Sequence, residues 1–142
     1  IQFMEYFPLN RLYNDFLNSA DIVIGMSGGE GWGLPEFHSV ALGKHAVILN
    51  ASSYKDWANE KNASLVYPCG KWPAEDGIFF KAGGLINQGN IFTFSEEEFI
   101  SSCEDAISRV KNNRVNLEGK KLREDFSYTK TCDKILEILQ SI

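Results

Sequence analysis

The segment from Ser27 to Gly43, which reads SGGEGWGLPEFHSVALG, constrains the fold of this chain more than any other. It follows an apolar run at 22–26 whose unbroken hydrophobicity is typical of a buried parallel strand. Pro35 suits the first turn of a helix, and Gly43 suits a left-handed cap after the end of that helix. The sequence therefore predicts a strand, a glycine-rich turn and a helix over 35–42.

A strand, a glycine turn and a helix N-terminus together present backbone N–H groups to an anion, most often a phosphate. Glu30 lies inside this turn, where its carboxylate would repel a phosphate. A carboxylate is useful at this place if it accepts hydrogen bonds from hydroxyl groups of the same ligand. A ligand that carries both phosphate and hydroxyl groups indicates a nucleotide sugar.

This segment resembles the signature of retaining glycosyltransferases of the glycosyl-transferase group 1 family, which have the GT-B fold. The resemblance is carried by Ser27-x-x-Glu30-Gly31-Trp32-Gly33-Leu34-Pro35 and by Ala41-x-Gly43. It implies that the turn binds the diphosphate of the donor and that Glu30 is the catalytic residue, in contact with the donor sugar. The donor-binding residues that it implies are Ser27, Gly28, Gly29, Gly31, Trp32, Gly33, Leu34 and His38.

Two positions depart from the family pattern. Eight residues after Glu30, where the family usually has a second Glu that holds the ribose, this chain has His38. Glu36 lies about 200° away around the helix, so it does not simply replace that residue. His38 has two open interpretations: an imidazole that makes one hydrogen bond to the ribose, or a structural histidine. His45, where the family usually has Pro, is interpreted as structural.

The resemblance implies an α/β fold, in which a Rossmann-like parallel sheet with flanking helices forms the C-terminal half-domain of a GT-B glycosyltransferase. Apolar runs that alternate with helical patterns independently predict βαβ units. Residues 1–142 are expected to form one donor-binding domain, with 68–94 as a loop or hairpin insertion. Strands are expected at 2–6, 22–26, 46–49 and 64–67, and helices at 9–20, 35–42, 53–60, 95–111, 115–125 and 129–142.

Composition argues against several classes of partner. A net charge of −5 without a basic block disfavours nucleic acid and anionic membranes. No apolar run reaches the roughly 20 residues that span a bilayer. Three widely spaced cysteines fit a reducing compartment and offer no metal-site spacing. We expect a cytoplasmic protein that needs no metal or other cofactor, with the nucleotide diphosphate sugar as its substrate.

The reaction that the resemblance implies is transfer of a sugar from a nucleotide diphosphate donor to a sugar or other hydroxyl acceptor, with retention. The chain begins at Ile1 inside an expected strand, which we interpret as a domain of a longer protein. The acceptor would then bind through the missing N-terminal domain. The Arg and Lys that stabilise the leaving diphosphate in the family also lie upstream of the matched residues. We expect this chain alone to bind the donor weakly and to be inactive.

Two other classes of function stay open. One is a non-catalytic nucleotide-sugar binding module, in which His38 marks lost activity. The other is a structural or partner-docking domain, which would use the aromatic residues of 78–94 and an open sheet edge. A Rossmann oxidoreductase fits less well, because Gly-Gly-Glu-Gly-Trp-Gly lacks the G-x-G-x-x-G spacing.

Overall fold

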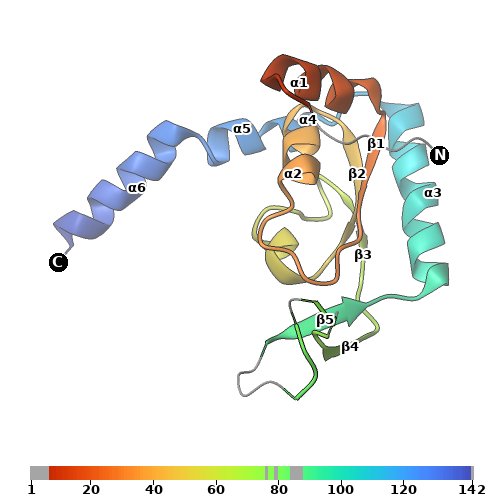
Figure 1. The fold of residues 1–142 in the computed structure, drawn as a ribbon. Coiled ribbons are helices and arrows are strands. Elements are labelled where there is room, and N and C mark those ends of the chain that lie inside the picture. The colour runs from red at the N-terminus through yellow and green to blue at the C-terminus, as the bar shows by residue number, and fades with distance from the viewer. Residues whose placement is uncertain (1–6, 76, 79, 84–87, 142) are drawn as a thin grey trace.

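The structure is a computed structural model that describes residues 7–75, 77–78, 80–83 and 88–141. Helices and strands alternate in its first half, and helices dominate its second half (Figure 1). In chain order the elements are α1 (Asn10–Ser19), β1 (Ile22–Gly25), α2 (Leu34–Ala41), β2 (His45–Leu49), η1 (Ser52–Asp56), β3 (Ser64–Val66), β4 (Gly70–Pro73), β5 (Asn90–Thr93), α3 (Glu96–Asn112), α4 (Leu117–Lys120), α5 (Leu122–Asp125) and α6 (Tyr128–Gln140). The strand expected at 2–6 lies outside the described residues.

The first three strands form a parallel sheet in the order β1-β2-β3. Ile22 pairs with His45, and Val47 pairs with Ser64, so the carboxyl ends of the strands meet at one edge of the sheet. Parallel neighbours need a crossover connection, which α2 provides between β1 and β2. The predicted α/β class with a parallel sheet and flanking helices is confirmed, and this arrangement is compatible with a Rossmann-like fold.

The core lies on both faces of β2, whose five residues are all buried. Ala46 and Ile48 pack in one cluster with Val40 of α2, and Val47 and Leu49 pack in another with Ala106 of α3. Successive side chains of a strand point to opposite faces, so one apolar run serves two helices. Figure 1 shows α2 and α3 on opposite sides of the sheet.

β1 differs from the expectation of a strand buried on both faces. Ile24 is 52% exposed. Within the described residues β1 is an edge strand that pairs only with β2. Helix α3 packs mainly over β2 and β3, so it leaves part of the same face of β1 uncovered.

Two helices also differ from their expected bounds. Residues 53–60 form only the short 3₁₀ helix η1, after which Asn62 closes a turn by accepting a hydrogen bond from the N–H of Asn59 (2.8 Å). The helix expected at 115–125 is divided into α4 and α5. The break lets Gly119 approach the Val40 carbonyl while Leu122 enters the core beside α2.

Helix α3 begins as the sequence predicts, at an N-cap serine. Ser95 Oγ accepts a hydrogen bond from the N–H of Glu98 (3.2 Å), and Glu96, Glu97 and Glu98 occupy the first turn. Helix α6 buries none of its residues and extends away from the body of the molecule (Figure 1). Within the described residues, no helix combines the length and apolar character needed to cross a membrane.

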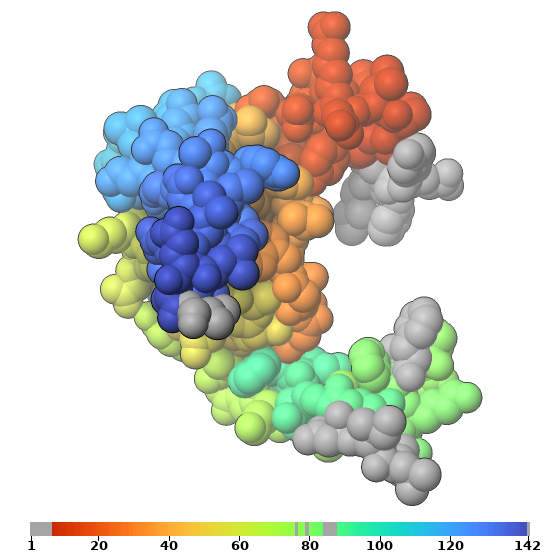
Figure 2. Space-filling view, turned by 90° about the vertical axis from the view of Figure 1, so that its left-hand side faces the viewer, coloured from red at the N-terminus to blue at the C-terminus, as the bar shows by residue number. Residues whose placement is uncertain are grey.

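Residues 68–94, expected to form a loop or hairpin, contain β4 and β5, which pair antiparallel. Gly70 lies opposite Thr93, and Pro73 lies opposite Asn90. The hairpin lies beyond the carboxyl edge of the sheet and projects from the body of the molecule (Figures 1 and 2). It therefore stands next to the segment that follows β1.

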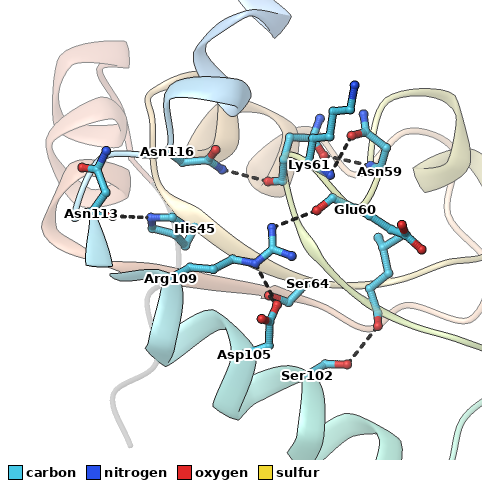
Figure 3. A network of polar contacts seen from close by, with 12 residues as sticks. His45, Asn59, Glu60, Lys61, Ser64, Ser102, Asp105, Arg109, Asn113 and Asn116 are labelled. Carbon is cyan, nitrogen blue, oxygen red and sulfur yellow. Dashed lines mark hydrogen bonds and ion pairs between the residues drawn. The ribbon is translucent and has the colours of Figure 1, made fainter. Parts of the chain in front are cut away.

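The opposite, amino edge of the sheet is closed by polar contacts (Figure 3). His45 Nε2 lies 2.8 Å from the Asn113 carbonyl oxygen, in agreement with its structural interpretation. Ser64 Oγ donates to the carboxylate of Asp105 (2.6 Å), and Arg109 Nε donates to the same carboxylate (2.7 Å). These contacts tie β2 and β3 to α3 at the end of the sheet that lies away from the glycine turn.

Candidate functional site

The glycine turn, defined as residues 27–33, leaves β1 at the carboxyl edge of the sheet. Open parallel sheets bind ligands in the crevice outside this edge. The turn, η1 and the hairpin enclose a pocket of about 420 Å³, whose lining includes Ser27, Glu30, Ser52 and Asn90. Figure 2 shows a hollow on this side of the molecule, between the orange atoms of the segment from β1 to α2 and the green hairpin.

Helix α2 starts directly after the turn with Gly33 as its N-cap. Gly33 has a φ of 74°, and a Cβ there would collide with the ring of Tyr54. Pro35 lies in the first helical turn, as predicted. Among the described residues, the N–H groups of Trp32, Gly33 and Leu34 have no acceptor. These N–H groups lie at the positive end of the helix dipole, where an anion is stabilised.

The glycines of the turn divide into two kinds. Gly28 and Gly33 are required by packing: a Cβ at Gly28 would lie 2.5 Å from the Phe92 carbonyl oxygen of the hairpin. The backbone conformation does not require glycine at Gly29 or Gly31, because both residues lie outside the left-handed region of φ. Among the described atoms, a Cβ at Gly29 would meet only the Asn90 carbonyl oxygen, at 3.8 Å, and one at Gly31 would meet none within 4 Å.

The hairpin is attached to the turn by its backbone. The N–H of Phe92 donates to the carbonyl of Gly28 (2.9 Å). Gly28 therefore has a structural role whether or not it contacts a ligand. Among the described residues, nothing comparable explains the open space over Gly29 and Gly31.

Glu30 is held in the middle of the turn. Its backbone N–H donates to Ser52 Oγ (3.2 Å), and its carbonyl accepts from the hydroxyls of Ser52 and Ser53 (2.8 Å each). Its carboxylate accepts a hydrogen bond from the N–H of Gly31 (3.0 Å). The backbone of Glu30 is fixed by η1, while its half-exposed carboxylate lies at the pocket.

A second carboxylate lies close to the turn, and sequence reasoning set it aside. Glu36 Oε2 would lie 3.1 Å from a Cβ at Gly33, and its Cγ would lie 2.7 Å from a Cβ at Gly25. Burial raises the pKa of Glu36, its own backbone N–H partly opposes that rise, and the charge of Glu30 adds to it. The missing side chains of the two glycines make room for Glu36 beneath the turn.

His38 lies apart from the glycine turn. Its Nδ1 is 3.3 Å from the hydroxyl of Tyr13 in α1. It lines a second pocket of about 350 Å³ together with Asn10, Tyr13 and Arg123. The described lining residues of this pocket and of the glycine-turn pocket do not overlap. His38 comes five residues after Gly33, or about 7.5 Å along the helix axis.

Trp32 and Leu34 differ in their surroundings. The ring of Trp32 packs edge-on against Phe37 (5.6 Å between centroids) and Phe126 (5.4 Å). Its carbonyl accepts a hydrogen bond from the indole of Trp57 (2.9 Å). Leu34 is exposed. The side chain of Trp32 therefore packs behind the turn.

The structure thus gathers Ser27, Gly28, Gly29 and Glu30 at one pocket, places Gly31, Trp32, Gly33 and Leu34 at the start of α2, and separates His38 from both. Sequence reasoning missed Ser52 and Ser53, and it set Glu36 aside. The first two had a usable signal, because they directly follow the strand β2, whose carboxyl end must meet that of β1. Within the described residues, no three His, Cys, Asp or Glu side chains gather as metal ligands would.

Comparisons with protein-family models, with curated proteins and with solved structures found no match for this chain. The resemblance to group 1 glycosyltransferases therefore rests on the residues of the glycine turn and the start of α2.

Proposed function

We propose that this chain is the donor-binding part of a retaining glycosyltransferase, the C-terminal half-domain of a GT-B enzyme that uses a nucleotide diphosphate sugar. The observation that carries this proposal is the open space over Gly29 and Gly31, beside backbone N–H groups that have no acceptor among the described residues. Neither packing nor φ demands glycine at these two positions. A ligand that approaches the backbone closely does demand it.

The diphosphate is proposed to bind the N–H groups of Trp32, Gly33 and Leu34. Hydrogen bonds from N–H groups to an ionised phosphate are stronger than neutral ones. When the bond between the sugar and the diphosphate breaks, negative charge grows on the leaving diphosphate, and the helix N-terminus stabilises it where it develops. Gly33 caps α2 in the left-handed conformation, and the side chains of the described residues leave these N–H groups without an acceptor.

The sugar is proposed to bind at the carboxylate of Glu30. A carboxylate accepts hydrogen bonds from hydroxyl groups, and a site built for a hydroxyl strongly rejects an analogue that lacks it. Glu36 places a second carboxylate close to the turn, beside Gly25 and Gly33, and the charge of Glu30 raises its pKa. The carboxylate of Glu30 at the pocket favours a ligand that offers hydroxyl groups over a bare diphosphate.

The ribose is proposed to extend along α2 toward His38. His38 lies five residues after Gly33, about 7.5 Å further along the helix axis. In the tautomer in which Nδ1 accepts from the Tyr13 hydroxyl, Nε2 of His38 carries the proton and can donate to a ribose oxygen. A structural histidine packed on α1 is the competing interpretation.

Ligand-observed saturation-transfer NMR tests the proposal. The chain is titrated with UDP, GDP and ADP and with their common sugar conjugates, and the titration is repeated on Glu30→Ala. We expect transfer to the ribose and base of one nucleotide, with loss of the sugar signals in the variant. Glu97→Ala, an exposed carboxylate in the first turn of α3, is the matched control and should retain them. Transfer to none of these ligands would contradict the proposal.

A partner-docking domain is the second candidate, and α6 favours it. The helix exposes Ile135, Leu136 and Leu139, and it buries none of its side chains. Light scattering separates the two candidates. An oligomer whose mass is independent of nucleotide, in a chain that binds no nucleotide, would favour docking.

A further inference from the structure

Ser52 and Ser53 hold the main chain of Glu30 from a part of the sequence 22 and 23 residues away. Ser52 Oγ both donates to the carbonyl of Glu30 and accepts from its N–H, and Ser53 Oγ donates to the same carbonyl. Both polar groups of the Glu30 backbone are therefore satisfied by two hydroxyls of η1.

Ser52 makes these bonds in a strained conformation. Its φ is 54°, and no other non-glycine residue among those described has a positive φ. A side chain with a Cβ is disfavoured in this region, whereas glycine adopts it readily. Glycine would relieve the strain at position 52, but it would also remove the hydroxyl that holds Glu30. A strained backbone conformation persists only where contacts with the surrounding structure hold it in place, and such residues are frequent at functional sites.

The same short segment holds the glycine turn at three places. The side chain of Tyr54, which is buried, lies against Gly25 just before the turn and against Gly33 at its end. Ser52 and Ser53 hold its centre, and the indole of Trp57 donates to the carbonyl of Trp32 at its end. The segment after β2 therefore sets the course of the whole turn.

Glu30 needs such support because of its neighbours. Gly28, Gly29 and Gly31 surround it in the sequence, and glycine gives the chain more conformational freedom than any other residue. An unsupported carboxylate would occupy many positions, and ordering it on ligand binding would reduce affinity. The hydroxyls fix the peptide from which the carboxylate projects, and Ser52 itself lines the pocket.

We propose that Ser52 and Ser53 are positioning residues, which hold the backbone of Glu30 so that its carboxylate faces the sugar of a nucleoside diphosphate sugar in the glycine-turn pocket. This inference rests on the proposed function. The positioning role concerns recognition of the sugar alone. The two serine hydroxyls bond only Glu30, whereas the N–H groups assigned to the diphosphate belong to Trp32, Gly33 and Leu34.

The decisive variant is Ser52→Gly, which suits a φ of 54° and removes the hydroxyl. Isothermal titration calorimetry compares UDP-glucose with UDP, and GDP-mannose with GDP, at a temperature where each variant is folded. We expect affinity for the nucleoside diphosphate to stay unchanged, while the preference for its sugar conjugate falls by about 3- to 10-fold, as the loss of an ordered hydrogen bond predicts. Ser53→Ala removes one bond and should have a smaller effect.

Ser64→Ala is the matched control. This serine also bonds a residue distant in sequence, Asp105, but at the amino edge of the sheet. The control should lower the melting temperature without changing the ratio of the two affinities. A merely structural role of Ser52 would likewise leave that ratio unchanged.

The outcomes separate the two proposals. If the wild-type chain prefers the sugar conjugate, Glu30→Ala loses that preference and folded Ser52→Gly retains it, the positioning role is wrong and the proposed function stands. If the wild-type chain binds neither the nucleoside diphosphate nor its conjugate, the proposed function is overturned and the positioning role falls with it. Loss of the preference in Ser52→Gly, with unchanged nucleoside diphosphate affinity, supports both.

Discussion

Replacing Gly31 and Gly33 in turn by alanine separates the two kinds of glycine in the turn. At Gly31 the added Cβ meets no described atom within 4 Å, and the backbone lies outside the left-handed region. Alanine should therefore fold without strain and restrict the unfolded chain, for a gain of about 0.4–1 kcal/mol in the free energy of unfolding. In a domain of this size, that gain raises the melting temperature by about 1–4 °C.

Gly33→Ala should have the opposite effect. A φ of 74° costs a residue with a Cβ about 1–2 kcal/mol, and forcing the ring of Tyr54 aside costs about 1–3 kcal/mol more. The melting temperature should fall by at least about 5 °C. We therefore expect differential scanning calorimetry to show a raised melting temperature for Gly31→Ala and a lowered one for Gly33→Ala.

Ligand binding completes the test. The Cβ of Gly31→Ala projects into the space assigned to the donor, so affinity for the nucleotide should fall about tenfold or more although the fold is more stable. Gly29→Ala, whose Cβ would lie 3.8 Å from the Asn90 carbonyl, serves as a second probe of the same space. Wild-type affinity in a folded Gly31→Ala would refute the assignment of this space to a ligand.

Three further predictions concern the hairpin and two carboxyl groups. Gly28→Ala places a Cβ 2.5 Å from the Phe92 carbonyl and should displace the hairpin at a cost of about 1–3 kcal/mol, seen as faster hydrogen exchange of the Phe92 amide. Glu36 has a raised pKa, so the folded state loses stability as pH rises from the unfolded pKa through the folded pKa. Glu36→Gln should remove that loss. Equal free energies of unfolding for wild type and Glu36→Gln above this pH range, measured by denaturant titration, would contradict the prediction. The hydroxyl of Ser64, aided by Arg109, lowers the pKa of Asp105 against its burial, so its stabilisation is present above the unfolded pKa and is lost as pH falls through the folded pKa. Asp105→Asn should therefore be less stable than wild type at neutral pH and should approach it in acid-unfolding curves.

The parts of this fold that a sequence predicts well are those set by local chemistry. The run from Ala46 to Leu49 is apolar throughout because β2 meets a helix on each face. Ser95 and the acidic residues after it mark the start of α3 through hydrogen bonds to the nearest turn. Gly33 and Pro35 fix the start of α2 in the same way. In each case the residues that decide the structure are adjacent in the chain.

The candidate site was harder to predict because it depends on which face of α2 meets which neighbour. Helical spacing correctly separated Glu36 from His38, but it could not show that His38 faces α1 or that Glu36 lies beneath the turn. Gly25, at the end of β1, and Gly33 create the room for Glu36, and no local pattern reveals that. Ser52 and Ser53 reach Glu30 only after β1 and β2 have paired.

Helix α6 has a consequence for the folding cooperativity of the chain. Helices of its length, 13 residues, are marginal in water unless a packed face supports them. No residue of α6 is buried, so its opening should require little free energy and should not require the sheet to unfold. Its amides should therefore exchange with solvent well before those of β2, and a thermal transition followed by helical signal should begin before the core melts. The chain has two levels of stability, and α6 occupies the lower one.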